Sequence, residues 1–166
     1  TRLVAGGAVP DLELAGAIDR ADSPLIGQDA GAAAGVRALG VRVSADLGAA
    51  LAARPAVAVD FSFHAATAAA APQLVAAGVP WVVGTTGLDA AERGAIEQAA
   101  GRIPVVLSAN MSVGVNLLHA LVAQAARVLR GRGYDCEIVE RHHRRKKDAP
   151  SGTALYLGEA AAKGFG

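Results

Sequence analysis

Short apolar runs that alternate with alanine-rich helical stretches constrain the fold of this chain more than any other feature. The runs Val57–Phe63, Trp81–Gly84 and Ile103–Leu107 are separated by the helix-like stretches His64–Ala77 and Asp89–Ala100. Strands separated by helices of about 10–15 residues are typical of βαβ units, which build a parallel sheet. Polar residues do not alternate within the core of these runs, which indicates that helices cover both faces of the sheet. We therefore predict a doubly wound parallel α/β layer.

Two weaker elements precede this layer. Leu12–Ile18 is predicted to be a strand that stops at the charged pair Asp19-Arg20, and Ala45–Ala53 is predicted to be a short helix. The Gly/Ala-rich stretch between them is poorly patterned and predicts no element.

The pattern changes past Ser108. Val113–Leu129 predicts one long helix, Tyr134–Glu140 predicts a strand of a second sheet, and Ser151–Ala162 predicts another helix. Runs of different architecture in one chain indicate separate domains. We therefore expect a dinucleotide-binding domain at residues 1–111 and the start of an α+β domain at residues 112–166.

Composition excludes several classes of protein. Hydrophobic residues make up 52% of the 166 residues, so the chain is not intrinsically disordered. A net charge of +1 argues against a globally basic nucleic-acid binder. An apolar run of about 18 residues is missing, which predicts no membrane span. With Cys136 as its single cysteine, the chain cannot form an internal disulfide or a cysteine-based metal site, and we expect no metal and a cytoplasmic location.

Polar residues follow three of the predicted strands, where an open parallel sheet binds its ligands. Asp19-Arg20 could take the ribose hydroxyls and a 2′-phosphate of a dinucleotide, and a solvated turn is the alternative. The glycines of Gly84–Gly87 allow close approach of a ligand, although an ordinary loop would look the same. Ser108–Met111 leads into the long helix, with Ser112 as a candidate N-cap.

A basic loop is the sharpest local feature. Five of the 16 Lys and Arg residues fall within residues 141–147, together with two adjacent histidines, and a Ser-Gly-Thr helix start follows at 151–153. Backbone N–H groups at a helix start bind anions, so a small dicarboxylate fits this segment, with one histidine acting as a general acid. The alternatives are a loop that is simply solvated and a loop that binds the phosphate backbone of a nucleic acid. No aromatic residue lies among the charged residues, which disfavours binding of nucleic acid.

The segment Glu140–Ala154 resembles the E-x-H-H-x-x-K-x-D-A-P-S-G-T-A signature of the 4-hydroxy-tetrahydrodipicolinate (dihydrodipicolinate) reductases of lysine biosynthesis. Asp60–Ser62, Gly84–Gly87 and Ser108–Asn116 also match the family, in its order and at similar spacing. The resemblance covers the whole chain and implies a Rossmann-like domain followed by a substrate and oligomerisation domain.

The resemblance also implies an activity and a set of site residues. The reaction would be reduction of 4-hydroxy-tetrahydrodipicolinate to tetrahydrodipicolinate, with NADPH or NADH as the donor and a homotetramer as the full-length form. His142 would be the proton donor and Lys146 the second catalytic residue, while His143, Gly152 and Thr153 would hold the substrate carboxylates. The residues implied to contact the cofactor are Asp19, Arg20, Gly84, Thr85, Thr86, Ser108, Ala109, Asn110 and Met111.

Two family features fall outside this sequence. The family's glycine-rich phosphate loop would precede Thr1, and further strands of its second domain would follow Gly166. We therefore expect these 166 residues alone to lack reductase activity. Another NAD(P)-dependent dehydrogenase of an amino-acid precursor, or an inactive anion-binding or oligomerisation fragment, are the alternative functions.

Overall fold

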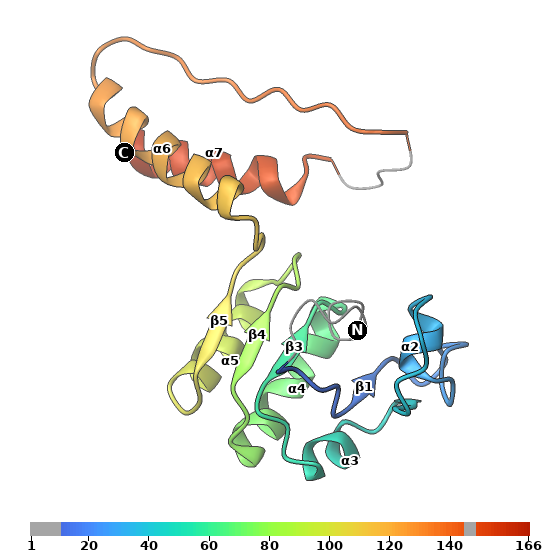
Figure 1. The fold of residues 1–166 in the computed structure, drawn as a ribbon. Coiled ribbons are helices and arrows are strands. Elements are labelled where there is room, and N and C mark those ends of the chain that lie inside the picture. Colours follow the sequence, from blue (N-terminus) through green and yellow to red (C-terminus); the bar gives the residue numbers. More distant parts are fainter. Residues whose placement is uncertain (1–10, 145–148) are drawn as a thin grey trace. The chain divides into compact units, whose positions relative to one another are not determined.

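The computed structural model describes residues 11–144 and 149–166 (Figure 1). The chain divides into two compact units, one formed by residues 1–82 and 88–106 and the other by residues 83–87 and 107–166. The division lies near the predicted domain boundary, which itself stays a prediction. In the described residues, no helix is long and apolar enough to cross a membrane.

The first unit begins with a two-stranded parallel sheet. Strand β1 (Ala17–Ile18) pairs with β2 (Val43–Ser44), and Ala17 lies opposite Val43. Helix α2 (Ala30–Ala33) lies between them in the sequence, within the stretch for which the pattern predicted no element. Its start depends on the Asp29 carboxylate, which accepts hydrogen bonds from the N–H groups of Gly31, Ala32, Leu39 and Gly40.

A three-stranded sheet in the order β3-β4-β5 follows. Its strands are β3 (Ala58–Asp60), β4 (Trp81–Val83) and β5 (Val105–Leu107). Its helices are α3 (Leu47–Ala52), α4 (His64–Ala77) and α5 (Ala90–Ala100). The Trp81 N–H donates to the Pro104 carbonyl, and the Ser108 N–H donates to the Val83 carbonyl. The bonded positions increase along both strands in the same direction, so β4 and β5 are parallel. The predicted parallel α/β architecture is thereby confirmed.

The sequence explains where these helices begin and end. Helix α4 ends at Gly78, whose φ of 66° is the left-handed conformation that glycine adopts most readily. Helix α5 begins with a capping box, in which the Asp89 side chain accepts from the Glu92 N–H and the Glu92 side chain accepts from the Asp89 N–H. Both helices lie against the three-stranded sheet (Figure 1), and Trp81, Leu74 and Ile96 are almost completely buried.

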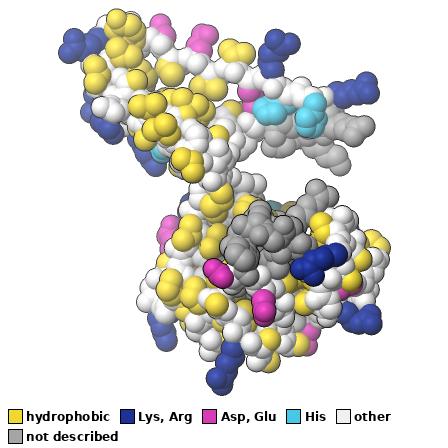
Figure 2. All heavy atoms as spheres, in the orientation of Figure 1, with side chains coloured by type: hydrophobic (Ala, Val, Ile, Leu, Met, Phe, Trp, Pro, Cys, Tyr) yellow, Lys and Arg dark blue, Asp and Glu magenta, His cyan; other side chains and the backbone are white. Residues whose placement is uncertain are grey.

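The second unit contains two long helices that lie side by side, α6 (Val113–Leu129) and α7 (Gly152–Phe165) (Figure 1). Ser112 and Ser151 cap their N-termini, since their hydroxyls accept from the N–H groups of Val115 and Ala154. The Ser112 cap was predicted. Hydrophobic side chains gather on the surface of this part of the molecule (Figure 2), and Val113 and Leu117 of α6 are both more than half exposed.

Gly164 sets how closely α6 and α7 approach each other. A Cβ atom at this position would overlap the Ala126 Cβ and lie 2.8 Å from the Ala123 carbonyl oxygen. Gly164→Ala should therefore lower the free energy of unfolding by about 1–3 kcal/mol, as overpacking does. In Gly158→Ala, on the same helix, the nearest atom would be Ile138 Cδ1 at 3.7 Å, so this control should be neutral or stabilising. Urea denaturation of both variants measures the difference, and equal stabilities would contradict the packing.

Three predicted strands differ in the structure. The strand expected at Val57–Phe63 is limited to Ala58–Asp60, and residues 61–63 lead into α4 and belong to no strand. Leu12–Ile18 was expected to be one strand, yet only Ala17–Ile18 pairs, because β2 is only two residues long. Tyr134–Glu140 was expected to pair in a second sheet, but it forms no strand. An alternating pattern needs a neighbouring strand to pair with, and in the described part of the second unit there is none. Val139 is accordingly 86% exposed.

Candidate functional site

Asp19 follows β1 directly and is held as an ionised carboxylate. Its Oδ2 accepts a hydrogen bond of 2.6 Å from the Ser23 hydroxyl, and its Oδ1 accepts one of 2.8 Å from the Arg20 N–H. The Ser23 hydroxyl, and after it the Arg20 N–H, hold the pKa of the Asp19 carboxyl below its usual range. A carboxylate that stays charged in this way can accept hydrogen bonds from hydroxyl groups, and the binding of ribose hydroxyls by Asp19 stays a prediction.

Arg20 lies beside Asp19 and pairs with Asp22. Its Nε is 3.0 Å from Asp22 Oδ1, and both side chains are about three-quarters exposed. Exposed ion pairs contribute little, typically 0–1 kcal/mol. The Arg20 guanidinium can therefore exchange Asp22 for an incoming anion at small cost.

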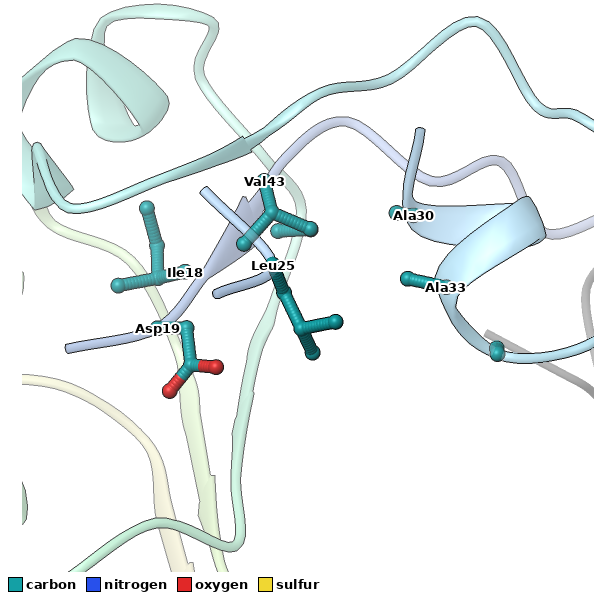
Figure 3. Close-up of a pocket in the computed structure, with 8 residues that line it drawn as sticks. Ile18, Asp19, Leu25, Ala30, Ala33 and Val43 are labelled. Atoms are coloured by element: carbon teal, nitrogen blue, oxygen red, sulfur yellow. The ribbon is translucent and has the colours of Figure 1, made fainter. Parts of the chain in front are cut away.

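A shallow pocket of about 220 Å³ lies next to Asp19. In Figure 3, Ala30 and Ala33 of α2 lie across from Leu25 and Val43, and the Asp19 carboxylate lies at the edge. Apolar walls with one fixed acceptor at the rim suit a flat base attached to a sugar that carries hydroxyl groups. A pocket with apolar walls and a carboxylate acceptor at its rim fits the adenosine end of a dinucleotide.

In the second unit, the structure brings the loops after β4 and β5 together. The Ser108 N–H donates to the Val83 carbonyl at 3.0 Å, so that Ser108 lies beside the start of the Gly84–Gly87 loop. Gly84 and Thr85 are buried, Ser108 is half-buried, and Thr86, Ala109 and Met111 are exposed. The two loops were predicted to share one edge of the sheet, and they do.

Asn110 connects this edge to the start of α7. Its Nδ2 donates to the Thr153 hydroxyl at 3.3 Å, and its carbonyl accepts from the Ser108 hydroxyl at 2.7 Å. One predicted cofactor residue is therefore in contact with one predicted substrate residue, although 43 positions separate them in the sequence. Gly152 is the first residue of α7, and it is exposed.

Glu140 lies between His142 and α7. Its Oε1 accepts from the Ser151 N–H at 2.8 Å, and its Oε2 lies 3.3 Å from His142 Nδ1. The His142 side chain is 42% exposed, so the ring remains open to a ligand while one edge faces the carboxylate. Figure 2 shows histidine side chains on the surface near an acidic side chain in this part of the molecule. Lys146 lies outside the described residues, and His143 is exposed.

Several residues at or near these sites were not assigned a role from the sequence. In the sequence, Glu140 is only the first letter of the family signature, and Asn116 is only one residue of a matching stretch. Asp60, by contrast, is a candidate from the sequence for the ligand rim or for the cap of α4; it accepts from the Ser62 N–H, and Phe63 occupies the N-cap position, so Asp60 is not the cap. No spacing rule connects Glu140 with Ser151, which is 11 positions away, so this contact had to come from the structure.

Comparison with known proteins gives consistent results for both units. The family model described as "Dihydrodipicolinate reductase, N-terminus" matches residues 4–111, and "Dihydrodipicolinate reductase, C-terminus" matches residues 114–166. A protein of Anaeromyxobacter dehalogenans strain 2CP-1, named 4-hydroxy-tetrahydrodipicolinate reductase, is 54% identical over 159 residues. Proteins of the same name are 50% identical in Laribacter hongkongensis and 52% identical in Methylocella silvestris.

These matches cover 93–96% of this chain and 56–58% of each relative, so the chain spans a little more than half the length of the curated relatives. One of the two family models alone matches more than half of the chain, and the relatives carry the same family name. The chain belongs to the dihydrodipicolinate reductase family.

Proposed function

We propose that the protein reduces 4-hydroxy-tetrahydrodipicolinate to tetrahydrodipicolinate, with NADPH or NADH as the electron donor. The observation that carries this proposal is the contact between Asn110 and Thr153, which joins the loop after β5 to the start of α7. The names of the relatives support the substrate. The roles of the individual residues below are part of the proposal.

The substrate carboxylates would bind at the start of α7. Gly152 and Thr153 offer N–H groups there, because the first N–H groups of a helix lack partners within it. His143 would supply a further donor. Anions are favoured at this end of a helix, where the backbone dipoles add to the hydrogen bonds.

The reduction consumes a proton, and His142 would supply it. Replacement of the substrate's 4-hydroxyl group by hydrogen takes one hydride and one proton, and it releases water. The bound nicotinamide supplies the hydride, and the loops at Gly84–Thr86 and Ser108–Met111 would hold its ring. His142 would donate the proton through Nε2, since its Nδ1 faces Glu140. Lys146 would assist at the same site.

Arg20 gives a test of the cofactor end. Because the Asp22 carboxylate that pairs with Arg20 is itself exposed, Arg20 would be able to take a 2′-phosphate, whereas the Asp19 carboxylate would accept from ribose hydroxyls. Arg20→Ala in the full-length protein should raise the KM for NADPH about tenfold, with little change for NADH, as loss of one charged hydrogen-bond partner would. Steady-state kinetics with both donors measure this. An equal loss for both donors would contradict the assignment.

The reaction itself is tested by following nicotinamide oxidation with the full-length protein. We expect oxidation that depends on 4-hydroxy-tetrahydrodipicolinate and does not occur with a monocarboxylate analogue. Oxidation with other amino-acid precursors but not with this dicarboxylate would instead indicate a different dehydrogenase. We further propose a homotetramer, which sedimentation of the same sample would measure, and a cytoplasmic location stays a prediction.

A further inference from the structure

Asn116, on the first turn of α6, holds the loop that precedes this helix. Its Nδ2 donates to the carbonyl oxygens of Asn110 at 2.8 Å and of Ser112 at 2.9 Å. An amide nitrogen has two hydrogens, so both of its donors are directed to the main chain of this loop. The side chain thereby fixes the path of the chain between β5 and α6.

Tyr156 of α7 contacts the Asn116 amide from the other side of the two helices' interface. The Tyr156 hydroxyl donates to Asn116 Oδ1 at 3.3 Å. The Tyr156 ring stacks on His119, with 3.9 Å between ring centroids and 15° between their planes. Because Nδ2 faces two carbonyls, a flipped amide would lose both of these hydrogen bonds, while the Tyr156 hydroxyl can serve as donor or acceptor.

The same loop carries Asn110, whose side chain reaches the proposed substrate site. Its Oδ1 accepts from the Ser112 N–H at 2.8 Å, and its Nδ2 donates to the Thr153 hydroxyl at 3.3 Å. A change in the main chain at Asn110 would therefore move a proposed cofactor loop and withdraw a partner from Thr153 at the same time. Hydrogen bonds connected in this way are affected together when one member is removed.

We propose that Asn116 is a positioning residue, held by Tyr156, that couples the loop at 108–111 to Thr153 at the start of α7. This inference rests on the proposed function, in which the loop contacts the nicotinamide and Thr153 contacts a substrate carboxylate. Asn116 touches neither ligand, and it acts through Asn110. Its removal should disturb the relative placement of cofactor and substrate as well as the stability of α6.

Two variants of the full-length protein test the coupling. Asn116→Leu keeps the approximate size of the side chain and removes all of its hydrogen bonds, so kcat/KM should fall about 10- to 100-fold. Tyr156→Phe keeps the stack on His119 and removes only the hydroxyl, so we expect a fall of about two- to fivefold. A poorly placed nicotinamide slows hydride transfer, so in Asn116→Leu the deuterium isotope effect on kcat should rise.

Ser112→Ala is the matched structural control, because it removes the N-cap of the same helix but keeps the Ser112 carbonyl that Asn116 binds. It should lose stability and keep both kcat/KM and the isotope effect. Hydrogen exchange at residues 108–111 and NADPH affinity by calorimetry give readouts that do not depend on turnover. Asn116→Leu should speed exchange and weaken binding, and Ser112→Ala should do neither.

The outcomes separate this inference from the proposed function. If the wild-type protein does not oxidise NADPH with the dicarboxylate, the proposed function fails, and the exchange data still report whether Asn116 orders the loop. If the wild-type protein is active and Asn116→Leu loses only as much stability as Ser112→Ala, with unchanged kcat/KM, isotope effect and exchange, then Asn116 has a purely structural role and the inference is overturned.

Discussion

His142→Gln in the full-length protein should lower kcat about 10²- to 10⁴-fold with little change in KM, because a positioned general acid typically contributes that much. Glutamine is close to histidine in size and keeps a hydrogen-bond donor, but its amide cannot release a proton near neutral pH. The His142 ring is 42% exposed, so the substitution should not destabilise the fold. Steady-state kinetics at saturating NADPH measure the effect.

His143→Gln is the matched control for this variant, since the same change is made at the neighbouring exposed histidine. A residue that grips a carboxylate in both the ground state and the transition state mainly affects KM. We therefore expect His143→Gln to raise KM more than it lowers kcat. If both variants kept wild-type kcat, proton donation from this loop would be ruled out.

Glu140→Gln should lower kcat about 10- to 100-fold. Its remaining oxygen can still accept from the Ser151 N–H, but no charged acceptor would then face His142 Nδ1. The group bonded to one ring nitrogen determines which nitrogen carries the proton in a neutral histidine. Loss of a partner for a charge-assisted contact costs about 1.5–3 kcal/mol, which corresponds to the stated range.

Two measurements separate positioning from stability in this case. ¹⁵N correlation spectra report the tautomer of the neutral His142 ring, which should carry its proton on Nδ1 in the wild type and lose that preference in Glu140→Gln. Glu137→Gln, an exposed carboxylate on the same segment, should change neither the tautomer nor kcat. An unchanged tautomer with wild-type kcat in Glu140→Gln would show that Glu140 only supports the start of α7.

Local signals in the sequence predicted the helices well. The ranges His64–Ala77 and Val113–Leu129 agree with α4 and α6 residue for residue, because Gly78 and Ser112 mark a helix end and a helix start by chemistry that acts within a few residues. Helix α2 was missed because its N-cap, Asp29, also binds the N–H groups of Leu39 and Gly40, ten and eleven positions away. A short helix stabilised from such a distance leaves no periodic pattern.

The site was predictable only in part. The strand-end rule brought the loops at Gly84 and Ser108 to one edge, because the geometry of a parallel sheet requires it. The contacts of Asn110 with Thr153 and of Asn116 with Tyr156 depend on how α7 packs on α6. That packing depends on how closely the side chains of the two helices fit, as at Gly164. The spacing of residues in a single sequence does not reveal this fit.

Transfer of deuterium from NADPH labelled at the transferable position of the nicotinamide ring tests whether the protein reduces this dicarboxylate. The full-length protein is incubated with 4-hydroxy-tetrahydrodipicolinate and the labelled donor, and the product is analysed by mass spectrometry. We expect tetrahydrodipicolinate that carries one deuterium for each NADPH oxidised, and no labelled product from a sample without protein. Oxidation of NADPH without label in the dicarboxylate, or no reaction with this substrate, would contradict this expectation.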